Sequence, residues 1–149
     1  DRCLDINRNH APAYFLSGSL HLRLGQPRDT ILVIERAFAL SPRDLLRAVW
    51  HAMKARAHFF LGDHLLAIRE AQKGTAANRD HAHNYSVLAA ALVALNRMEE
   101  AEKAGKEFER ALPGITVDRY ISDIASSDPL ARTSYEPLKK GLLEAGLPM

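Results

Sequence analysis

The feature that most constrains the fold is a helix-turn-helix unit at residues 11–44, because its spacing returns twice further along the chain. The unit begins APAYFLSGSLHLRLG, turns at Gly25-Gln26-Pro27, continues as DTILVIERAFAL and closes at Ser41-Pro42. Both halves carry apolar residues at helical spacing, and small residues stand where two packed helices would come close. The spacing therefore predicts a hairpin of two antiparallel helices.

Two further units follow in the same phase. Setting Gly62 against Gly25 aligns residues 48–81 as a second unit, and the two glycines lie 37 positions apart. The three extra residues, 45–47, are expected to add a helical turn. The third unit, residues 82–115, follows at a spacing of 34, with Asn96 in place of the turn glycine. Gly25 is expected to end its helix in a left-handed conformation, and Asp44 is a candidate cap for the helix that follows.

The in-phase positions resemble the tetratricopeptide repeat family. An aromatic residue stands fourth in the first and third units, small residues stand eighth and twentieth in every unit, and proline closes the first and third: these are Tyr14, Tyr85, Gly18, Ala55, Ala89, Thr30, Ala67, Ala101, Pro42 and Pro113. The departures are His51 in place of the aromatic residue of the second unit, Arg79 in place of its closing proline, and Phe108 in the third unit at a third position that is small in the other two units. The resemblance covers residues 11–115 and implies an all-α fold, a right-handed superhelical array of antiparallel hairpins that serves as a scaffold for binding other proteins.

The flanks of the repeats are interpreted separately. Residues 1–10, which include Cys3, are expected to be the remnant of a preceding repeat, so the sequence is interpreted as part of a longer protein. Cys3, Leu4 and Ile6 could then expose an interface that drives dimerisation.

Residues 116–149 are expected to form about two capping helices that cover the end of the stack. The first, within residues 116–127, would turn Tyr120, Ile121 and Ile124 inward. Asp128-Pro129 gives a cap and first-turn signal. The second would start at a Thr133–Glu136 capping box and end at Gly146.

The tail also resembles a second group of proteins. The stretch PLKKGLLEAGLP at residues 137–148 is similar to the closing segment after tetratricopeptide-like arrays in bacterial adenylate/guanylate cyclases and related signalling proteins. That resemblance implies a regulatory or assembly region whose catalytic domain would lie N-terminal to the repeats.

The family resemblance also implies a binding groove, lined by the first helix of each repeat. Carrying over its lining places gives Phe15, Ser19, Leu22, Arg23, Ala52, Arg56, Phe59, Phe60, His83, Ser86, Ala90 and Val93. Apolar surface beside Arg23 and Arg56 would suit an apolar peptide or helix with an acidic group. The alternative is that Phe59 and Phe60 pack between repeats and that both arginines are solvated. Binding of chaperone tails is disfavoured, because Phe15 and Ser19 occupy places where that function needs lysine and asparagine.

Composition excludes several classes of function. A net charge of +2 without a concentrated basic stripe disfavours nucleic acid. No apolar run approaches the ~20 residues of a membrane helix, so no membrane insertion is expected. The single cysteine excludes an internal disulfide framework and is compatible with the cytoplasm.

No catalytic set, cofactor motif or metal-ligand spacing stands out, and the seven histidines, among them His51 and His58, lack suitable companions. We therefore expect a non-enzymatic scaffold that binds a protein or peptide partner, with self-association as one possibility. A groove that senses a small molecule or peptide and an array that only spaces two domains are the alternatives.

Overall fold

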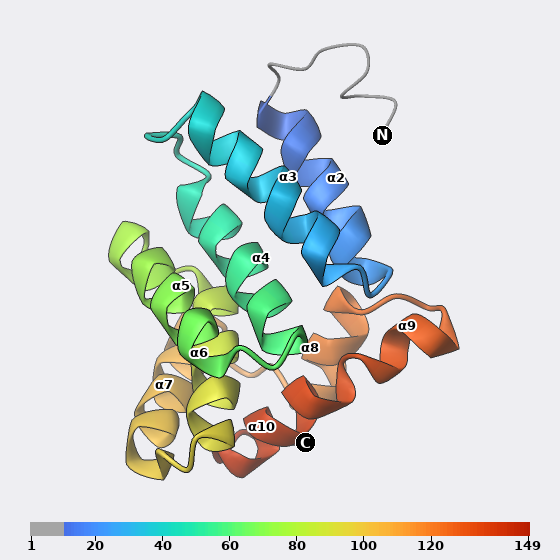
Figure 1. Ribbon diagram of the computed structural model, residues 1–149. Coiled ribbons are helices and arrows are strands. Elements are labelled where there is room, and N and C mark those ends of the chain that lie inside the picture. The colour runs from blue at the N-terminus through green and yellow to red at the C-terminus, as the bar shows by residue number, and fades with distance from the viewer. Residues whose placement is uncertain (1–10) are drawn as a thin grey trace.

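The computed structural model describes residues 11–149, and this part of the chain contains helices and no strand (Figure 1). The predicted remnant at residues 1–10, with Cys3, Leu4 and Ile6, lies outside the described residues. The helices are α2 (Ala11–Arg23), α3 (Pro27–Leu40), α4 (Arg47–Phe60), α5 (His64–Ala77), α6 (Ala82–Ala94), α7 (Met98–Ala111), α8 (Val117–Ile124), α9 (Pro129–Thr133) and α10 (Glu136–Glu144).

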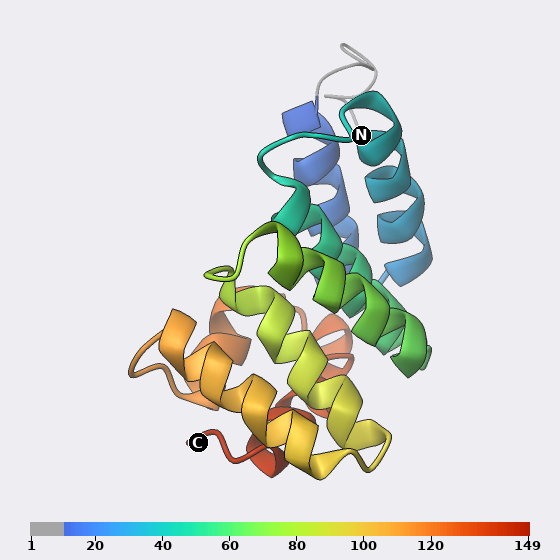
Figure 2. The ribbon, with the colours of Figure 1, turned by 90° about the vertical axis from the view of Figure 1, so that its left-hand side faces the viewer.

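The first six helices form three hairpins stacked in chain order: α2 with α3, α4 with α5, and α6 with α7 (Figures 1 and 2). Successive hairpins are joined because α3 packs against α4 and α5 packs against α6. The first helices of the hairpins, α2, α4 and α6, also contact one another in sequence and form an inner layer. This arrangement confirms the predicted all-α array of antiparallel hairpins.

The turn inside each hairpin depends on one residue with a positive φ. These residues are Gly25 at φ 70°, Gly62 at 82° and Asn96 at 58°. Asparagine tolerates the left-handed region better than other residues with a Cβ, because its short polar side chain can bond locally. The prediction that Asn96 replaces the turn glycine is therefore confirmed.

The extra residues of the second unit do not extend a helix, so the predicted additional helical turn is wrong. Leu45 and Leu46 form a turn, and α4 begins at Arg47. The Asp44 Oδ1 atom accepts a hydrogen bond from the Leu46 backbone N–H at 2.8 Å, which holds the chain in that turn. Asp44 thus organises the entry to α4 without capping the helix itself.

The small residues of the repeat pattern lie at the helix contacts. Ala55, Ala67, Ala89, Ala101 and Thr30 are fully buried. The closest approach joins Gly74 on α5 to the buried carboxamide of Asn84 on α6, where a Cβ would overlap the amide atoms. These contacts let the helices pack closely enough to exclude water from a continuous core.

Three helices follow the hairpins in the described chain, where about two were predicted. The predicted inward face of α8 is confirmed, because Tyr120, Ile121 and Ile124 are buried. The additional helix is α9, whose first turn is capped by Asp128: its Oδ2 atom accepts from the Ala131 N–H at 3.2 Å.

The predicted capping box at Thr133 is wrong. The Thr133 hydroxyl donates to the Leu130 carbonyl at 2.6 Å and so belongs to the end of α9. Helix α10 begins at Glu136 after Tyr135, without a side-chain cap. The predicted end of this helix is confirmed, because Gly146 has a φ of 96° and the Leu147 N–H donates back to the Leu142 carbonyl at 3.2 Å.

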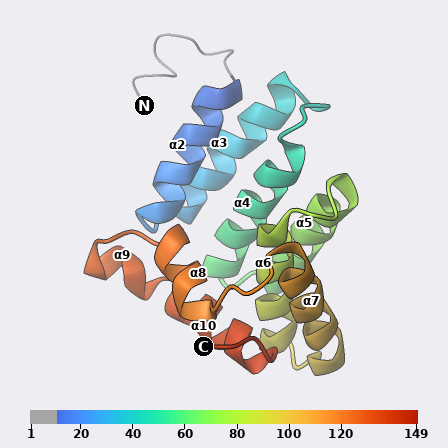
Figure 3. The ribbon, with the colours of Figure 1, turned by 180° about the vertical axis from the view of Figure 1, so that it is seen from behind.

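The C-terminal helices lie along the inner layer, although they were expected to cover the end of the stack. Helix α10 packs against α6, and α8 lies beside it (Figure 3). The Tyr135 hydroxyl donates to the Leu22 carbonyl on α2 at 3.3 Å. Gly141 makes the approach to α6 possible, because a Cβ there would lie 2.7 Å from the Ala90 Cβ. The segment therefore folds back across the array from its third hairpin to its first.

Candidate functional site

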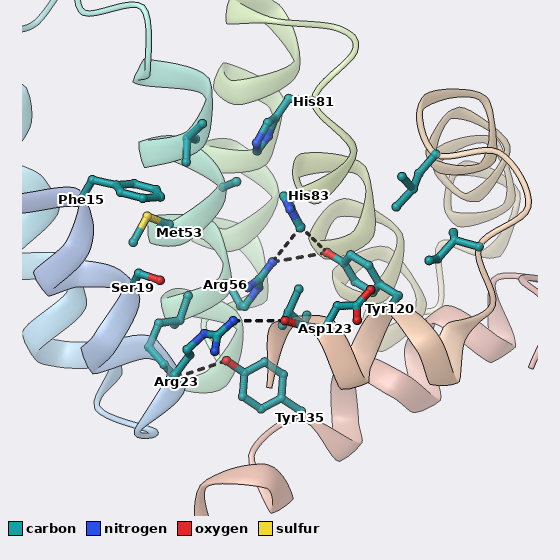
Figure 4. A pocket seen from close by; sticks show the side chains of 16 residues that line it. Phe15, Ser19, Arg23, Met53, Arg56, His81, His83, Tyr120, Asp123 and Tyr135 are labelled. Carbon is teal, nitrogen blue, oxygen red and sulfur yellow. Dashed lines mark hydrogen bonds between the residues drawn. The ribbon is translucent and has the colours of Figure 1, made fainter. Parts of the chain in front are cut away.

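The folded-back segment leaves a partly open pocket of about 410 Å³ on the inner side of the array (Figure 4). Helices α2 and α4 form one wall, the start of α6 lies behind, and α8 forms the opposite wall. The lining residues are Phe15, Ser19, Leu22, Arg23, Val49, Ala52, Met53, Arg56, His81, His83, Leu112, Ile115, Tyr120, Asp123, Ile124 and Tyr135. Half of these side chains are apolar, and the other half carry polar groups that define what the pocket can recognise.

Seven of the twelve predicted groove residues line this pocket: Phe15, Ser19, Leu22, Arg23, Ala52, Arg56 and His83. The other five lie beside or beneath the C-terminal helices. Phe59 and Phe60 border a smaller hollow of about 200 Å³ next to Ser134 and Pro137. Ser86, Ala90 and Val93 are buried, and Ala90 lies against Gly141 of α10. The chain's own tail therefore occupies that half of the inner face.

Sequence reasoning missed the part of the pocket that the tail supplies. Tyr120, Asp123, Ile124 and Tyr135 come from α8 and from the turn before α10. The helical spacing of the buried residues in α8 was visible in the sequence, but no signal identified the inner layer of the array as the surface that they cover. The sequence therefore indicated that α8 has a buried face, but not which helices that face packs against.

Arg56 is the central polar group of the pocket, and only 7% of it is exposed. Its Nη2 atom donates to the Tyr120 hydroxyl and to His83 Nδ1, both at 3.3 Å (Figure 4). Its Nε–H is buried and has no acceptor among the described residues. No carboxylate of residues 11–149 forms a salt bridge with this guanidinium, and its two hydrogen-bond acceptors are uncharged groups.

Arg23, the second predicted arginine, is exposed at the rim of the pocket. Its Nη2 atom donates to the backbone carbonyl of Asp123 at 3.1 Å, which ties α2 to α8. The Asp123 carboxylate points to another partner and pairs with Arg119 Nε at 3.1 Å. Arg23 therefore helps to hold the two walls of the pocket together, and Arg56 is the buried arginine of the pocket.

A hydrogen-bonded network surrounds Arg56. Tyr120 lies with its hydroxyl 2.8 Å from His83 Nδ1 and 2.7 Å from Ser86 Oγ. Burial, together with the positive charge of Arg56, lowers the pKa of His83 to about 3. His83 is consequently neutral at physiological pH, and its Nδ1 atom accepts hydrogen bonds. Burial also raises the pKa of the Tyr120 hydroxyl, which therefore stays protonated.

His51, one of the histidines considered as metal ligands, lies outside the lining of the pocket. His51 Nδ1 lies 2.8 Å from Glu70 Oε2, and its ring stacks against Phe38 at a centroid distance of 4.6 Å. Burial would raise the pKa of Glu70, but the His51 hydrogen bond and the charges of Lys54 and Lys73 lower it to about 2. Within residues 11–149, no group of three histidine, cysteine or acidic side chains is placed to hold a metal ion.

Solved structures with the same architecture identify the fold. The array superposes on a crystal structure of MamA with a TM-score of 0.67, at 21% identity over 97% of this chain and 82% of that one. It superposes with a TM-score of 0.64 on the first tetratricopeptide domain of Spaghetti (RPAP3), solved with the HSP90 peptide SRMEEVD, at 20% identity over 89% of this chain and 95% of that one. The fold is that of a tetratricopeptide array. The tetratricopeptide domain of Arabidopsis OM64 gives the same TM-score at 15% identity, over 87% of this chain and 94% of that domain.

One curated relative is similar in sequence. Anaphase-promoting complex subunit 7 of Dictyostelium discoideum is 31% identical over 112 residues, which is 75% of this chain. The chain spans only 18% of the length of that protein. No family model matches the sequence. The structure and these proteins therefore agree on a tetratricopeptide array. Among residues 11–149, no helix combines the length and the apolar character that crossing a membrane requires.

Proposed function

We propose that this tetratricopeptide array is a protein-interaction module that binds a segment of a partner protein in the pocket between α2, α4 and α8. The observation that carries the proposal is that the inner layer already holds a helical segment. Helices α8 and α10 of the same chain cover half of this surface, through contacts such as that of Gly141 with Ala90. The remaining half has the same kind of lining, with apolar side chains around a buried Arg56.

Similar arrays support a peptide as the ligand. The Spaghetti (RPAP3) domain was solved with a bound HSP90 peptide. None of the similar proteins named above is a nucleotide cyclase, so the proposal is limited to this array. Regulation of an attached enzyme, self-association and a cytoplasmic location stay predictions.

Selection from a displayed peptide library tests the proposal. The wild-type chain is expected to enrich peptides that bind with micromolar affinity, measured afterwards by calorimetry with synthetic peptides. Ser19→Phe would fill the pocket from its partly buried wall and should abolish binding. Leu32→Phe, which adds an aromatic ring at a position on α3 that is 59% exposed, is the matched control and should retain it. Peptides that bind equally to both variants, or no enriched peptide, would refute the proposal.

A second function, recognition of a small molecule, is favoured by the size of the pocket. A volume of about 410 Å³ lies within the range of sites that hold small ligands.

A further inference from the structure

The loop that joins α3 to α4, residues 41–46, carries the most exposed leucine of residues 11–149. Leu45 is 95% exposed, the adjacent Leu46 is 38% exposed, and Leu40 at the end of α3 is 45% exposed. Single exposed leucines are common on protein surfaces, but three at one connection form an apolar tip. Figure 1 shows this loop projecting away from the two helices that it joins. The tip is therefore accessible to a partner from solution.

The apolar residues of the tip belong to the part of the loop that lengthens the second unit. Residues 45–47, Leu-Leu-Arg, are the three extra residues of that unit. The corresponding connection between α5 and α6, residues 78–81, is shorter and reads Asn-Arg-Asp-His. The hairpins thus stack equally well on a short polar connection. Two added leucines on an exposed loop therefore indicate an interaction surface.

Hydrogen bonds hold the loop in a fixed turn. Asp44 Oδ1 accepts from the Leu46 N–H at 2.8 Å, and Asp44 Oδ2 accepts from the Ser41 hydroxyl at 3.2 Å. The Asp44 N–H donates to the Ser41 carbonyl, and the Arg47 N–H donates to the Asp44 carbonyl, both at 3.2 Å. These bonds keep the leucines from folding back onto the protein. A preformed tip also loses less conformational entropy when it binds a partner.

Positive charge flanks the apolar tip. Arg43 and Arg47 form no salt bridge with any carboxylate of residues 11–149. Asp44 is the acidic residue of the loop, and both of its carboxylate oxygens are used within the loop. Figure 2 shows the α5–α6 connection on the same edge of the array. That connection adds the exposed Arg79, while its Asp80 is paired with an arginine of α7. This edge therefore complements an anionic partner.

An apolar tip flanked by arginines matches the surface of an anionic bilayer. Leucines at the tip can enter the boundary between headgroups and acyl chains, and arginines beside them stay at the level of the lipid phosphates. A folded protein would need a socket of matching shape with an acidic rim, whereas a bilayer adapts to the shape of the tip. The projecting form of the loop therefore favours a membrane surface as the partner.

We propose that the α3–α4 loop is a peripheral membrane contact that places Leu45 and Leu46 in the surface of an anionic bilayer, where Arg43 and Arg47 bind the lipid headgroups. The contact stays at the surface, and no part of the loop crosses the bilayer. The loop residues do not line the pocket between α2, α4 and α8, so the inference is independent of the proposed function.

Co-sedimentation with sucrose-loaded vesicles tests the inference. Half of the wild-type protein is expected to bind at about 1 mM lipid when about one third of the phosphatidylcholine is replaced by phosphatidylserine. Binding to vesicles of phosphatidylcholine alone should be at least about tenfold weaker, because two arginines then lose their anionic partners. Arg43→Gln with Arg47→Gln should remove this preference. Arg28→Gln with Arg36→Gln, at two exposed positions on α3, should preserve it.

The leucines are tested with a pair of matched double variants. Leu45→Ser with Leu46→Ser should weaken binding to the anionic vesicles by at least about tenfold, because less apolar surface is removed from water. Leu65→Ser with Leu66→Ser changes an adjacent pair on α5 that is 63% and 41% exposed, and should bind like the wild type. Circular dichroism of each variant checks that the helices are retained.

Fluorescence distinguishes insertion of the tip from electrostatic adhesion. Trp50 is the one tryptophan of the sequence and is fully buried, so its emission serves as a constant background. Leu45→Trp should show a blue shift in emission when anionic vesicles are added, because its ring enters an apolar environment. Leu65→Trp, with the same ring on α5, should show no shift.

Three results would overturn the inference. They are absence of wild-type binding at about 10 mM anionic lipid, undiminished binding by the folded Leu45→Ser, Leu46→Ser variant, and an unshifted Leu45→Trp emission in the bound protein. Absence of vesicle binding would instead favour a partner protein with an apolar socket and an acidic rim. Each of these results would leave the proposed function of the pocket standing, because that function is tested with peptides and without lipid.

Discussion

The substitution Gly141→Ala tests whether α10 lies on the inner layer. An added Cβ would stand 2.7 Å from the Ala90 Cβ and 2.8 Å from its Cα, and these atoms belong to the backbone region of a buried helix that cannot rotate away. The helices would have to separate by about 1 Å to restore van der Waals contact. Overpacking of this kind costs about 1–3 kcal/mol, while replacing glycine in a helix recovers about 1 kcal/mol of helix propensity.

The expected net loss is therefore up to about 2 kcal/mol in the free energy of unfolding. Urea denaturation followed by circular dichroism at 222 nm measures it. Lys140→Ala is the matched control, since its side chain is 77% exposed and its ion pair with Glu144 spans 3.8 Å; it should change stability by less than about 0.5 kcal/mol. Without the contact at Ala90, only the gain in helix propensity would remain, so a Gly141→Ala protein about 1 kcal/mol more stable than the wild type would refute the placement of α10.

Three further substitutions probe the array and the pocket. Gly74→Ala should destabilise the chain by about 2 kcal/mol after the gain in helix propensity, because the new Cβ would overlap the Asn84 carboxamide, which is fully buried; in urea denaturation, a cost below that of the exposed Gln72→Ala would contradict this packing. Asn96→Ala should cost about 1 kcal/mol while Asn96→Gly should not, because φ is 58°; equal melting temperatures would be the contrary result. The pKa of His83 falls from 6.5 to about 3 on folding. Between these two values the unfolded chain binds a proton at His83 that the folded chain does not bind. The free energy of unfolding therefore decreases as pH falls from about 6.5 towards 3, by up to about 1.4 kcal/mol per pH unit. Comparing unfolding at pH 7 and pH 5, His83→Gln should lose less stability than the wild type, and an identical loss in both proteins would argue against a buried neutral His83.

The hairpins could be predicted from the sequence because their determinants are local. Helical spacing of apolar residues, small residues at the contacts and a left-handed turn residue recur in phase, so Gly62 and even Asn96 could be placed before the structure was known. The errors in these regions were also local. The Asp44 carboxylate accepts from the Leu46 N–H in a turn, and the Thr133 hydroxyl donates to the Leu130 carbonyl within α9. In each case the side chain had more than one possible hydrogen-bond partner nearby, and residue spacing does not indicate which one it takes.

The position of the tail could not be predicted, because it depends on residues far apart in the chain. Tyr135 meets Leu22, and Tyr120 meets Arg56, across separations that no periodicity records. Six of the predicted groove residues on α2 and α4 line the pocket, whereas Phe59 and Phe60 border another hollow. Ser86, Ala90 and Val93 were assigned to the same groove and not to the surface on which the tail lies. The sequence also did not indicate that Arg56 is buried, because its burial depends on contacts with His83 and Tyr120, which are distant in the chain.

The most direct test of the folded-back tail is a nuclear Overhauser measurement between aromatic rings. The rings of Phe60, at the end of α4, and Tyr135, just before α10, have centroids 4.9 Å apart. The structure predicts strong cross-peaks between their ring protons, with a second set between His83 and Tyr120, whose centroids are 5.5 Å apart. Absence of both sets in a folded, assigned protein would contradict the account and would place the C-terminal helices away from the inner layer.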